Sequence, residues 1–172
     1  MAKFRASKSE DTIRRSEVVT VRLDPKLKYL AELAARRQRR TLSSFIEWAI
    51  EHSLTRLHPA YAAQADDAPT FMDAAPVLWD VDEADRLAKL ALNYPELLNH
   101  EEQLIWKLIC ENGFLWKGRY DKPGGEWQWN VVANNLLIDR LRQHWDTFRD
   151  VARGKQPASA LPTGEKDDEI PF

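Results

Sequence analysis

The sequence of 172 residues contains one cysteine, six glycines and only short apolar runs. A single thiol, Cys110, cannot form an internal disulfide, and it has no neighbouring cysteine with which to build a zinc site. The apolar runs are too short for a membrane span or for the apolar region of a secretion signal. We therefore expect a soluble cytoplasmic protein without a membrane partner, in which Cys110 is a thiol of the core.

Sequence patterns of the common catalytic sites are missing as well. The sequence has no glycine-rich phosphate loop and no nucleophile elbow. Its four histidines lack the spacing typical of metal ligands and are His52, His58, His100 and His144. We predict no catalytic residue, no metal site and no cofactor, and we do not expect an enzyme.

Charge is distributed unevenly along the chain, although 25 basic and 27 acidic residues give a net charge of only -2. Residues 1–58 contain 13 basic and 7 acidic residues, a net charge of +6. Residues 59–172 contain 12 and 20, a net charge of -8. A basic segment joined to an acidic remainder favours a polyanion such as nucleic acid as the partner of the first segment.

Composition and periodicity divide the chain into five segments. Residues 1–16 are basic and without a period, which predicts a flexible arm. Residues 17–57 and 77–153 have the patterns of folded domains, and the Ala-, Asp- and Pro-rich residues 58–76 are expected to link them. Residues 154–172 are rich in charge and proline, which predicts a disordered acidic tail.

The first folded segment begins with alternating residues, the pattern of a half-buried strand over 17–24. Val19, Val21 and Leu23 share one face of this strand. The opposite, outward face consists of Val18, Thr20 and Arg22. No second strand follows nearby, and unpaired ladder groups beside an apolar face are unfavourable. Since the same strand of a second copy is the simplest partner, we expect an intertwined homodimer with a two-stranded antiparallel ribbon.

Two helices are predicted directly after this strand. Asp24 and Pro25 supply an N-cap and a proline at the first helical position, and apolar spacing then predicts a helix over about 25–37. Thr41 offers its hydroxyl as the N-cap of a second helix, over about 42–54.

The ribbon and the start of the second helix both suit DNA. A two-stranded ribbon fits the major groove, where Arg22 can pair bidentately with guanine and Thr20 can contact a base edge. The free backbone N–H groups of Leu42 and Ser43 and the helix dipole suit a phosphate. Two further cations, Arg39 and Arg40, lie next to these groups.

The residues VVTVRLDPKLKYLAELAARRQRRTLSSFIEWAIEHSL closely resemble the ribbon-helix-helix family of DNA-binding proteins, the Arc, MetJ and CopG type. The resemblance covers residues 17–55, and Arg39 stands where the turn of that family often carries a glycine. It implies that the base-reading residues are Val18, Thr20 and Arg22. It implies that the phosphate is held by Thr41, Leu42 and Ser43. The implied function is sequence-specific binding of double-stranded DNA by a homodimer, as a transcriptional repressor or as a plasmid- or phage-type factor that marks a DNA site.

Residues 77–153 are predicted to be mainly helical with one β-hairpin. Asp80 and Asn99 each stand three residues before a glutamate, a capping-box spacing that predicts helices through about residues 92 and 111. The Pro-Gly-Gly sequence between FLWKG and EWQWNV predicts the hairpin. Helical spacing predicts a last helix over about 132–152. The expected fold class is therefore mainly α, with a ribbon-helix-helix module, a second helical domain and a disordered tail.

Six of the seven tryptophans lie in this second domain. Trp106 and Trp145 fall on amphipathic helices and are expected in the core. Trp127 and Trp129, with Trp116 opposite, are candidates for stacking on unpaired bases. One alternative function is therefore that of an accessory protein that binds single-stranded DNA. A second alternative is an antitoxin, in which this domain neutralises a toxin while the N-terminal dimer regulates its own operon.

The last six residues, DDEIPF, closely resemble the acidic tip of bacterial single-stranded-DNA-binding proteins, which that family uses to dock on replication and repair enzymes. The resemblance implies docking on such host proteins by Asp167, Asp168, Glu169, Ile170, Pro171 and Phe172. An aromatic side chain suits an apolar pocket, and the acids suit its basic rim.

Overall fold

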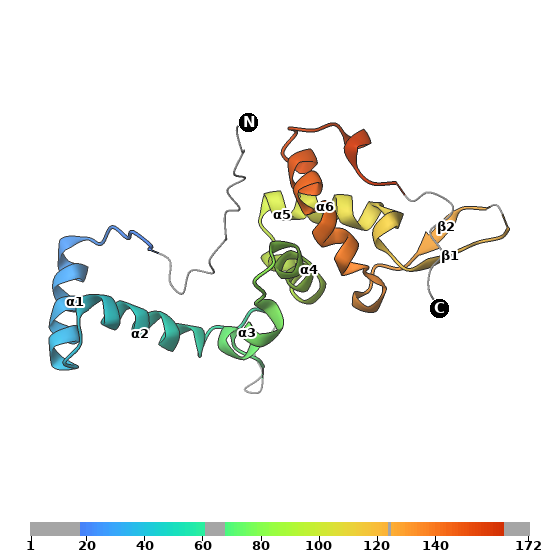
Figure 1. Ribbon diagram of the computed structural model, residues 1–172. Helices are drawn as coiled ribbons and strands as arrows, with labels where there is room; N and C mark the ends of the chain where they lie inside the picture. The colour runs from blue at the N-terminus through green and yellow to red at the C-terminus, as the bar shows by residue number, and fades with distance from the viewer. Residues whose placement is uncertain (1–17, 61–67, 124, 164–172) are drawn as a thin grey trace, which may run out of the picture. The chain divides into compact units, whose positions relative to one another are not determined.

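The structure, a computed structural model, describes residues 18–60, 68–123 and 125–163 (Figure 1). The helices in these residues are α1 Pro25–Arg37, α2 Leu42–Leu54, α3 Phe71–Leu78, α4 Glu83–Asn93, α5 His100–Glu111 and α6 Ile138–Ala152. The strands are β1 Gly118–Tyr120 and β2 Trp127–Trp129, which pair antiparallel. The short 3-10 helices are η1 Pro95–Leu97, η2 Gly113–Leu115, η3 Ala133–Asn135 and η4 Ala158–Ala160. The predicted mainly helical fold class is confirmed in this part of the chain.

The chain forms two compact units, and the division between them falls inside α2, between Ala49 and Ile50. No helix in the described ranges has the length and apolar character that crossing a lipid bilayer requires.

The first unit contains α1 and the first part of α2, whose bounds agree with the predicted ones. The Asp24 Oδ1 atom accepts hydrogen bonds from the backbone N–H groups of Lys26 at 3.0 Å and Leu27 at 3.1 Å, which confirms the predicted N-cap. Ala35 is the one buried residue among residues 18–49, and α2 contains none. Within a single chain, this unit therefore has almost no core.

The second unit has a substantial core in which α4, α5 and α6 pack on one another. Its buried apolar residues are Ala84, Leu87, Ala88, Ala91, Leu98, Ile105, Ile109, Leu115, Trp116, Leu141 and Phe148. The indole Nε1 of Trp116 donates a hydrogen bond to the Ile109 carbonyl oxygen at 2.8 Å, so this large side chain is buried without an unsatisfied donor.

An ion pair ties α4 to α6 beside this core. Asp85 is 7% exposed, and its two carboxylate oxygens accept bonds from Nε and Nη2 of Arg142, both at 2.7 Å. The remaining terminal nitrogen of Arg142 donates to Asp139 at 2.9 Å. The hydrogen bonds with Asp85 raise the pKa of Arg142 above its ordinary value, so the guanidinium stays charged.

The start of α4 differs from the prediction, which placed the cap at Asp80. Asp82 is the N-cap, and its Oδ1 atom accepts from the N–H groups of Ala84 at 2.8 Å and Asp85 at 3.3 Å. Asp80 instead pairs with the Lys89 ammonium at 2.7 Å. The capping-box spacing selected the wrong one of two nearby aspartates, because the carboxylate immediately before the first helical residue reaches the orphan N–H groups directly.

The predicted capping box of α5 is confirmed. The Asn99 Oδ1 atom accepts from the Glu102 N–H at 3.0 Å, and the Glu102 carboxylate accepts from the Asn99 N–H at 2.8 Å. The helix ends before Asn112, as expected.

The predicted hairpin is also present, with Arg119 opposite Gln128 in its register. The following helix begins later than predicted, because the chain first forms η3 and the Leu137 N–H bonds to the Leu115 carbonyl oxygen at 2.8 Å. α6 therefore starts at Ile138 rather than near Val132.

Part of the predicted linker, residues 58–76, is helical. Thr70 and Asp73 form a capping box at the start of α3. The Phe71 N–H donates to the Leu57 carbonyl oxygen at 2.8 Å, and His58 Nδ1 lies 3.2 Å from the Pro69 carbonyl oxygen. These contacts join the two ends of the segment between α2 and α3.

The first part of the predicted disordered tail, residues 154–163, is ordered. It contains η4, and Leu161 packs on the core of the second unit. The Asn112 side-chain amide donates to the Pro162 carbonyl oxygen at 2.9 Å. The composition of this segment predicted disorder, because composition does not reveal that a single apolar side chain, Leu161, packs on the core of the second unit.

Replacing Arg142 with methionine is expected to destabilise the second unit by about 3 kcal/mol or more, because the buried Asp85 carboxylate loses its partner. Asp139→Ala removes the exposed partner of the same arginine and should change stability by less than about 0.5 kcal/mol. Urea unfolding followed by tryptophan fluorescence measures both. Equal losses in the two variants would contradict a dominant role for the Asp85–Arg142 pair.

Candidate nucleic-acid interface

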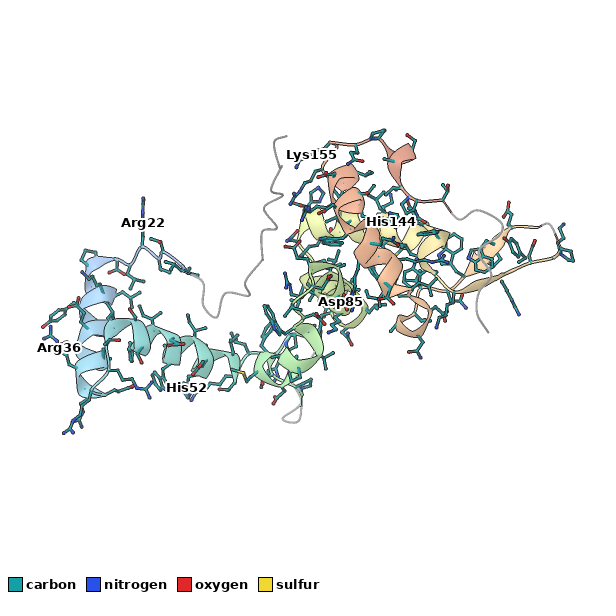
Figure 2. All side chains as sticks on the ribbon, in the orientation of Figure 1. Arg22, Arg36, His52, Asp85, His144 and Lys155 are labelled. Carbon is teal, nitrogen blue, oxygen red and sulfur yellow. The ribbon has the colours of Figure 1, made fainter. Side chains whose placement is uncertain are left out.

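The predicted base-reading residues lie in the segment before α1. Residues 18–24 form no strand and pair with no other segment of the described chain. Thr20 and Arg22 are exposed, and Arg22 points away from α1 (Figure 2). The apolar Val19 and Val21 are 79% and 61% exposed. A ribbon of two such segments stays a prediction, since it needs a strand that one described chain does not supply.

The predicted phosphate-binding residues surround the start of α2. The Thr41 Oγ1 atom accepts a hydrogen bond from the Ser44 N–H at 3.1 Å, which confirms the predicted N-cap. The N–H groups of Leu42 and Ser43 have no acceptor among the described residues. These orphan donors and the positive end of the helix dipole are available to an anion.

Arg39 adopts the left-handed backbone conformation, with φ of 57°. This is the conformation that favours glycine, the residue that the ribbon-helix-helix family often carries at this place. The Arg40 N–H donates to the Ala35 carbonyl oxygen at 2.9 Å and closes the turn that ends α1. The turn thus keeps the geometry suited to glycine while it carries an additional exposed cation.

A contact that the sequence analysis did not predict positions Arg40. Its guanidinium carbon lies 5.7 Å from the ring centroid of Trp48, a cation–π distance. Phe45 packs against the same tryptophan, with ring centroids 5.7 Å apart. The signal was a tryptophan two turns into the second helix, which places its ring near the residues that precede the N-cap.

The tryptophans of the second unit are mostly structural. Trp116, one of the candidates for stacking, is 1% exposed. The Trp129 Nε1 donates to the Cys110 carbonyl oxygen at 3.0 Å, and a Cβ added at Gly118 would come within 2.8 Å of the Trp127 ring. The expected core positions of Trp106 and Trp145 are confirmed, since both pack on the core. These contacts occupy much of the ring surface that stacking on unpaired bases would require.

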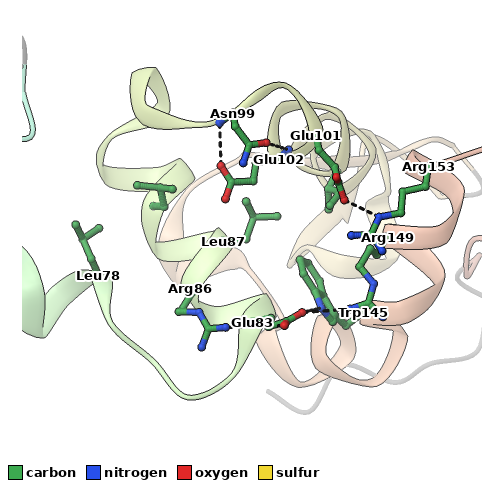
Figure 3. A pocket seen from close by; sticks show the side chains of 12 residues that line it. Leu78, Glu83, Arg86, Leu87, Asn99, Glu101, Glu102, Trp145, Arg149 and Arg153 are labelled. Atoms are coloured by element: carbon green, nitrogen blue, oxygen red, sulfur yellow. Dashed lines mark hydrogen bonds and ion pairs between the residues drawn. The ribbon is translucent and has the colours of Figure 1, made fainter. Parts of the chain in front are cut away.

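A cavity of about 440 Å³ lies on the second unit (Figure 3). It is lined by the C-terminal end of α3, by α4, by the first half of α5 and by α6. Its apolar lining residues are Leu78, Leu87, Leu90, Ile105 and Trp145. Its charged lining residues are Glu83, Arg86, Glu101, Glu102, Arg149 and Arg153.

The carboxylate of Glu83 is held at this cavity by two donors from α6. Its Oε2 atom accepts from the Trp145 Nε1 at 3.0 Å and from Arg149 at 3.2 Å. The hydrogen bond from Trp145, with a smaller effect of the Arg149 charge, lowers the pKa of Glu83 below its ordinary value. Glu83 therefore remains ionised at neutral pH.

Chemistry at Cys110 is disfavoured. Burial raises the pKa of this half-buried thiol to about 11, so the reactive thiolate is scarce at neutral pH. Among residues 18–60, 68–123 and 125–163, no three His, Cys, Asp or Glu side chains are grouped so that they can hold a metal ion. The predicted docking residues 167–172 lie outside the described residues.

No protein-family model, no curated protein and no solved structure matches this chain.

Arg39→Gly is expected to stabilise the turn by up to about 1 kcal/mol, because glycine adopts the left-handed conformation without strain. The same variant should weaken binding to any DNA duplex through loss of a cation. Arg39→Lys keeps both the charge and the strain, so it should change neither quantity. Urea unfolding and gel shifts at fixed salt measure the two effects. A glycine variant less stable than the lysine variant would argue against the left-handed turn in solution.

Proposed function

We propose that this protein is a homodimeric, sequence-specific binder of double-stranded DNA that acts in the cytoplasm. In this proposal, residues 18–54 of two chains form one ribbon-helix-helix module. The observation that carries it is the apolar surface that this segment leaves uncovered within a single chain.

The uncovered side chains have the spacing of one strand face and one helix stripe. On α1, Leu27, Leu30 and Leu33 are 51%, 50% and 40% exposed, and their spacing of three places them on one side of the helix. Val19 and Val21, in the segment before α1, are exposed as well. Burying a side chain of this size stabilises a fold by about 1.5–3 kcal/mol, so covering these residues is strongly favourable.

A second copy is the partner that meets both needs of this segment. It supplies an apolar surface of the same kind, and it supplies a strand that can pair antiparallel with residues 18–24 across a two-fold axis. A different protein would have to supply both an apolar surface and an unpaired strand at the same place.

The polar features of the same segment favour DNA as its ligand. In a paired ribbon, Thr20 and Arg22 lie on the face opposite Val19 and Val21 and are free to contact base edges. Arg39 and the orphan N–H groups at the start of α2 supply contacts to phosphate, which add affinity without selecting sequence. The net charge of +6 over residues 1–58 supports the same ligand.

The biological role that fits these features is a repressor or a factor that marks a site on a plasmid or phage genome. Docking of residues 167–172 on host replication or repair proteins would bring such proteins to the marked site. This docking rests on the resemblance of the DDEIPF sequence and on its combination of acids with an aromatic residue.

Two neighbouring substitutions test the dimer. Val21→Asp places a charge in the expected apolar interface of both copies and should weaken dimerisation by about 3 kcal/mol, about 100-fold in dissociation constant. Thr20→Asp introduces the same charge on the outward face and should leave the dimer intact while it abolishes DNA binding. Sedimentation velocity measures the mass of each variant.

A wild-type protein that sediments as a monomer at micromolar concentration would refute the proposed module. Equal effects of the two aspartates on the mass would refute the assignment of faces.

Base reading is tested with Arg22→Ala on a duplex selected from a random pool by the wild-type protein. Loss of one bidentate contact is expected to cost about 1–3 kcal/mol on the selected site. Binding to unselected duplex should fall only as much as it does in Arg36→Ala, which removes an exposed cation from the end of α1. If selected and unselected duplexes lose the same affinity in gel shifts, Arg22 contacts phosphate rather than a base.

A further inference from the structure

The acidic groups that line the cavity of the second unit are already engaged by protein donors. Glu83 accepts from Trp145 and Arg149, and Glu101 accepts from the Arg153 Nε at 2.6 Å. Glu102 belongs to the capping box of α5. Within the described residues, each of these three carboxylates therefore already accepts a hydrogen bond.

One basic group at the cavity, Arg153, keeps unused donors. The two terminal nitrogens of Arg153 have no acceptor in the described part of the chain, where this arginine bonds only through Nε. Guanidinium groups preferentially bind carboxylates. The cavity is thus suited to a ligand that brings carboxylates to its rim.

The apolar part of the cavity defines the rest of the ligand. Its volume, about 440 Å³, is sufficient for a few side chains. Next to it, the guanidinium of Arg86 lies 5.2 Å from the ring centroid of Trp79, which is 66% exposed. An aromatic face of this kind suits a proline or an aliphatic residue. The matching ligand is a peptide in which acidic residues adjoin bulky apolar ones.

We propose that the cavity binds residues 164–172 of this protein, with Ile170 and Phe172 against its apolar walls and the preceding acids at Arg153. The segment GEKDDEIPF contains four acids and one lysine, followed by three apolar residues. It combines in one short stretch the two kinds of group that the cavity requires.

The reach of the chain permits this contact. The bond between Asn112 and Pro162 fixes the chain beside the C-terminal end of α5. The cavity residues Glu101 and Ile105 lie in the first half of that helix, and twelve helical residues span about 18 Å. Nine residues follow Thr163, and an extended stretch of that length spans about 30 Å.

Docking in the cavity would make residues 167–172 inaccessible to other proteins. The second unit would then control the exposure of the segment that we propose to recruit host proteins. The inference does not depend on DNA binding by residues 18–54, and its test contains no DNA.

Photocrosslinking in the full-length chain tests the contact. Phe172 is replaced by the photoreactive p-benzoylphenylalanine, the protein is irradiated, and crosslinked peptides are identified by mass spectrometry. The expected crosslinks are to residues that line the cavity on α4, α5 and α6. Crosslinks confined to residues 18–54, or scattered without preference over the second unit, would overturn the proposal.

A charge reversal and its matched control extend the test. Arg153→Glu is expected to lower the yield of cavity crosslinks about tenfold, since it removes a charge-assisted hydrogen bond and repels the acids. Arg119→Glu, the same reversal on the exposed face of the hairpin, should leave the yield unchanged. Circular dichroism verifies that both variants are folded. An unchanged yield in a folded Arg153→Glu protein, or equal reductions in both variants, would also overturn the proposal.

Discussion

The first unit has more exposed apolar surface than its own residues can bury within one chain. Among residues 18–54, the two short helices and the segment before them bury a single alanine, Ala35, while Val19, Val21, Leu27, Leu30 and Leu33 are exposed. The hydrophobic effect makes such a surface unfavourable for an isolated chain. In the homodimer that we propose, the second copy covers this apolar surface, and the polar face of residues 18–24 is left free for DNA.

The second unit follows the opposite principle, because it completes its core within one chain. Three helices enclose Trp116 and Phe148, and the charge of Asp85 is neutralised where α4 meets α6. Residues 59–172 carry a net charge of -8. In the function that we propose, the basic first segment binds DNA and the C-terminal residues dock on proteins, so different parts of one molecule carry the two roles.

Local signals were sufficient to predict much of this structure from the sequence. The caps Asp24, Thr41 and Asn99 fixed three helix starts, because one side chain satisfies adjacent N–H groups. The Pro-Gly-Gly turn fixed the hairpin for a similarly local reason. Of the candidate interface, the sequence identified the residues around Thr41, since a helix start is visible in the order of residues.

Contacts between distant residues were not predictable in this way. The placement of Leu161 depends on a surface built by other helices, and composition alone suggested disorder around it. The cavity brings together residues from four helices, so neither its arginines nor its apolar walls stand out as a motif. Helical periodicity places the Trp48 ring on the side of α2 that faces its N-terminus. It does not predict the contact with Arg40, because Arg40 precedes the N-cap and so lies outside the helical pattern.

The two ends of the segment between α2 and α3 lie close together, because the Phe71 N–H bonds to the Leu57 carbonyl oxygen and His58 Nδ1 lies near the Pro69 carbonyl oxygen. The entropy of closing such a loop grows slowly, by about 0.6 kcal/mol for each doubling of its length. A fluorescent reporter or an affinity module can accordingly be inserted among residues 61–67, with little expected disturbance to the helices on either side.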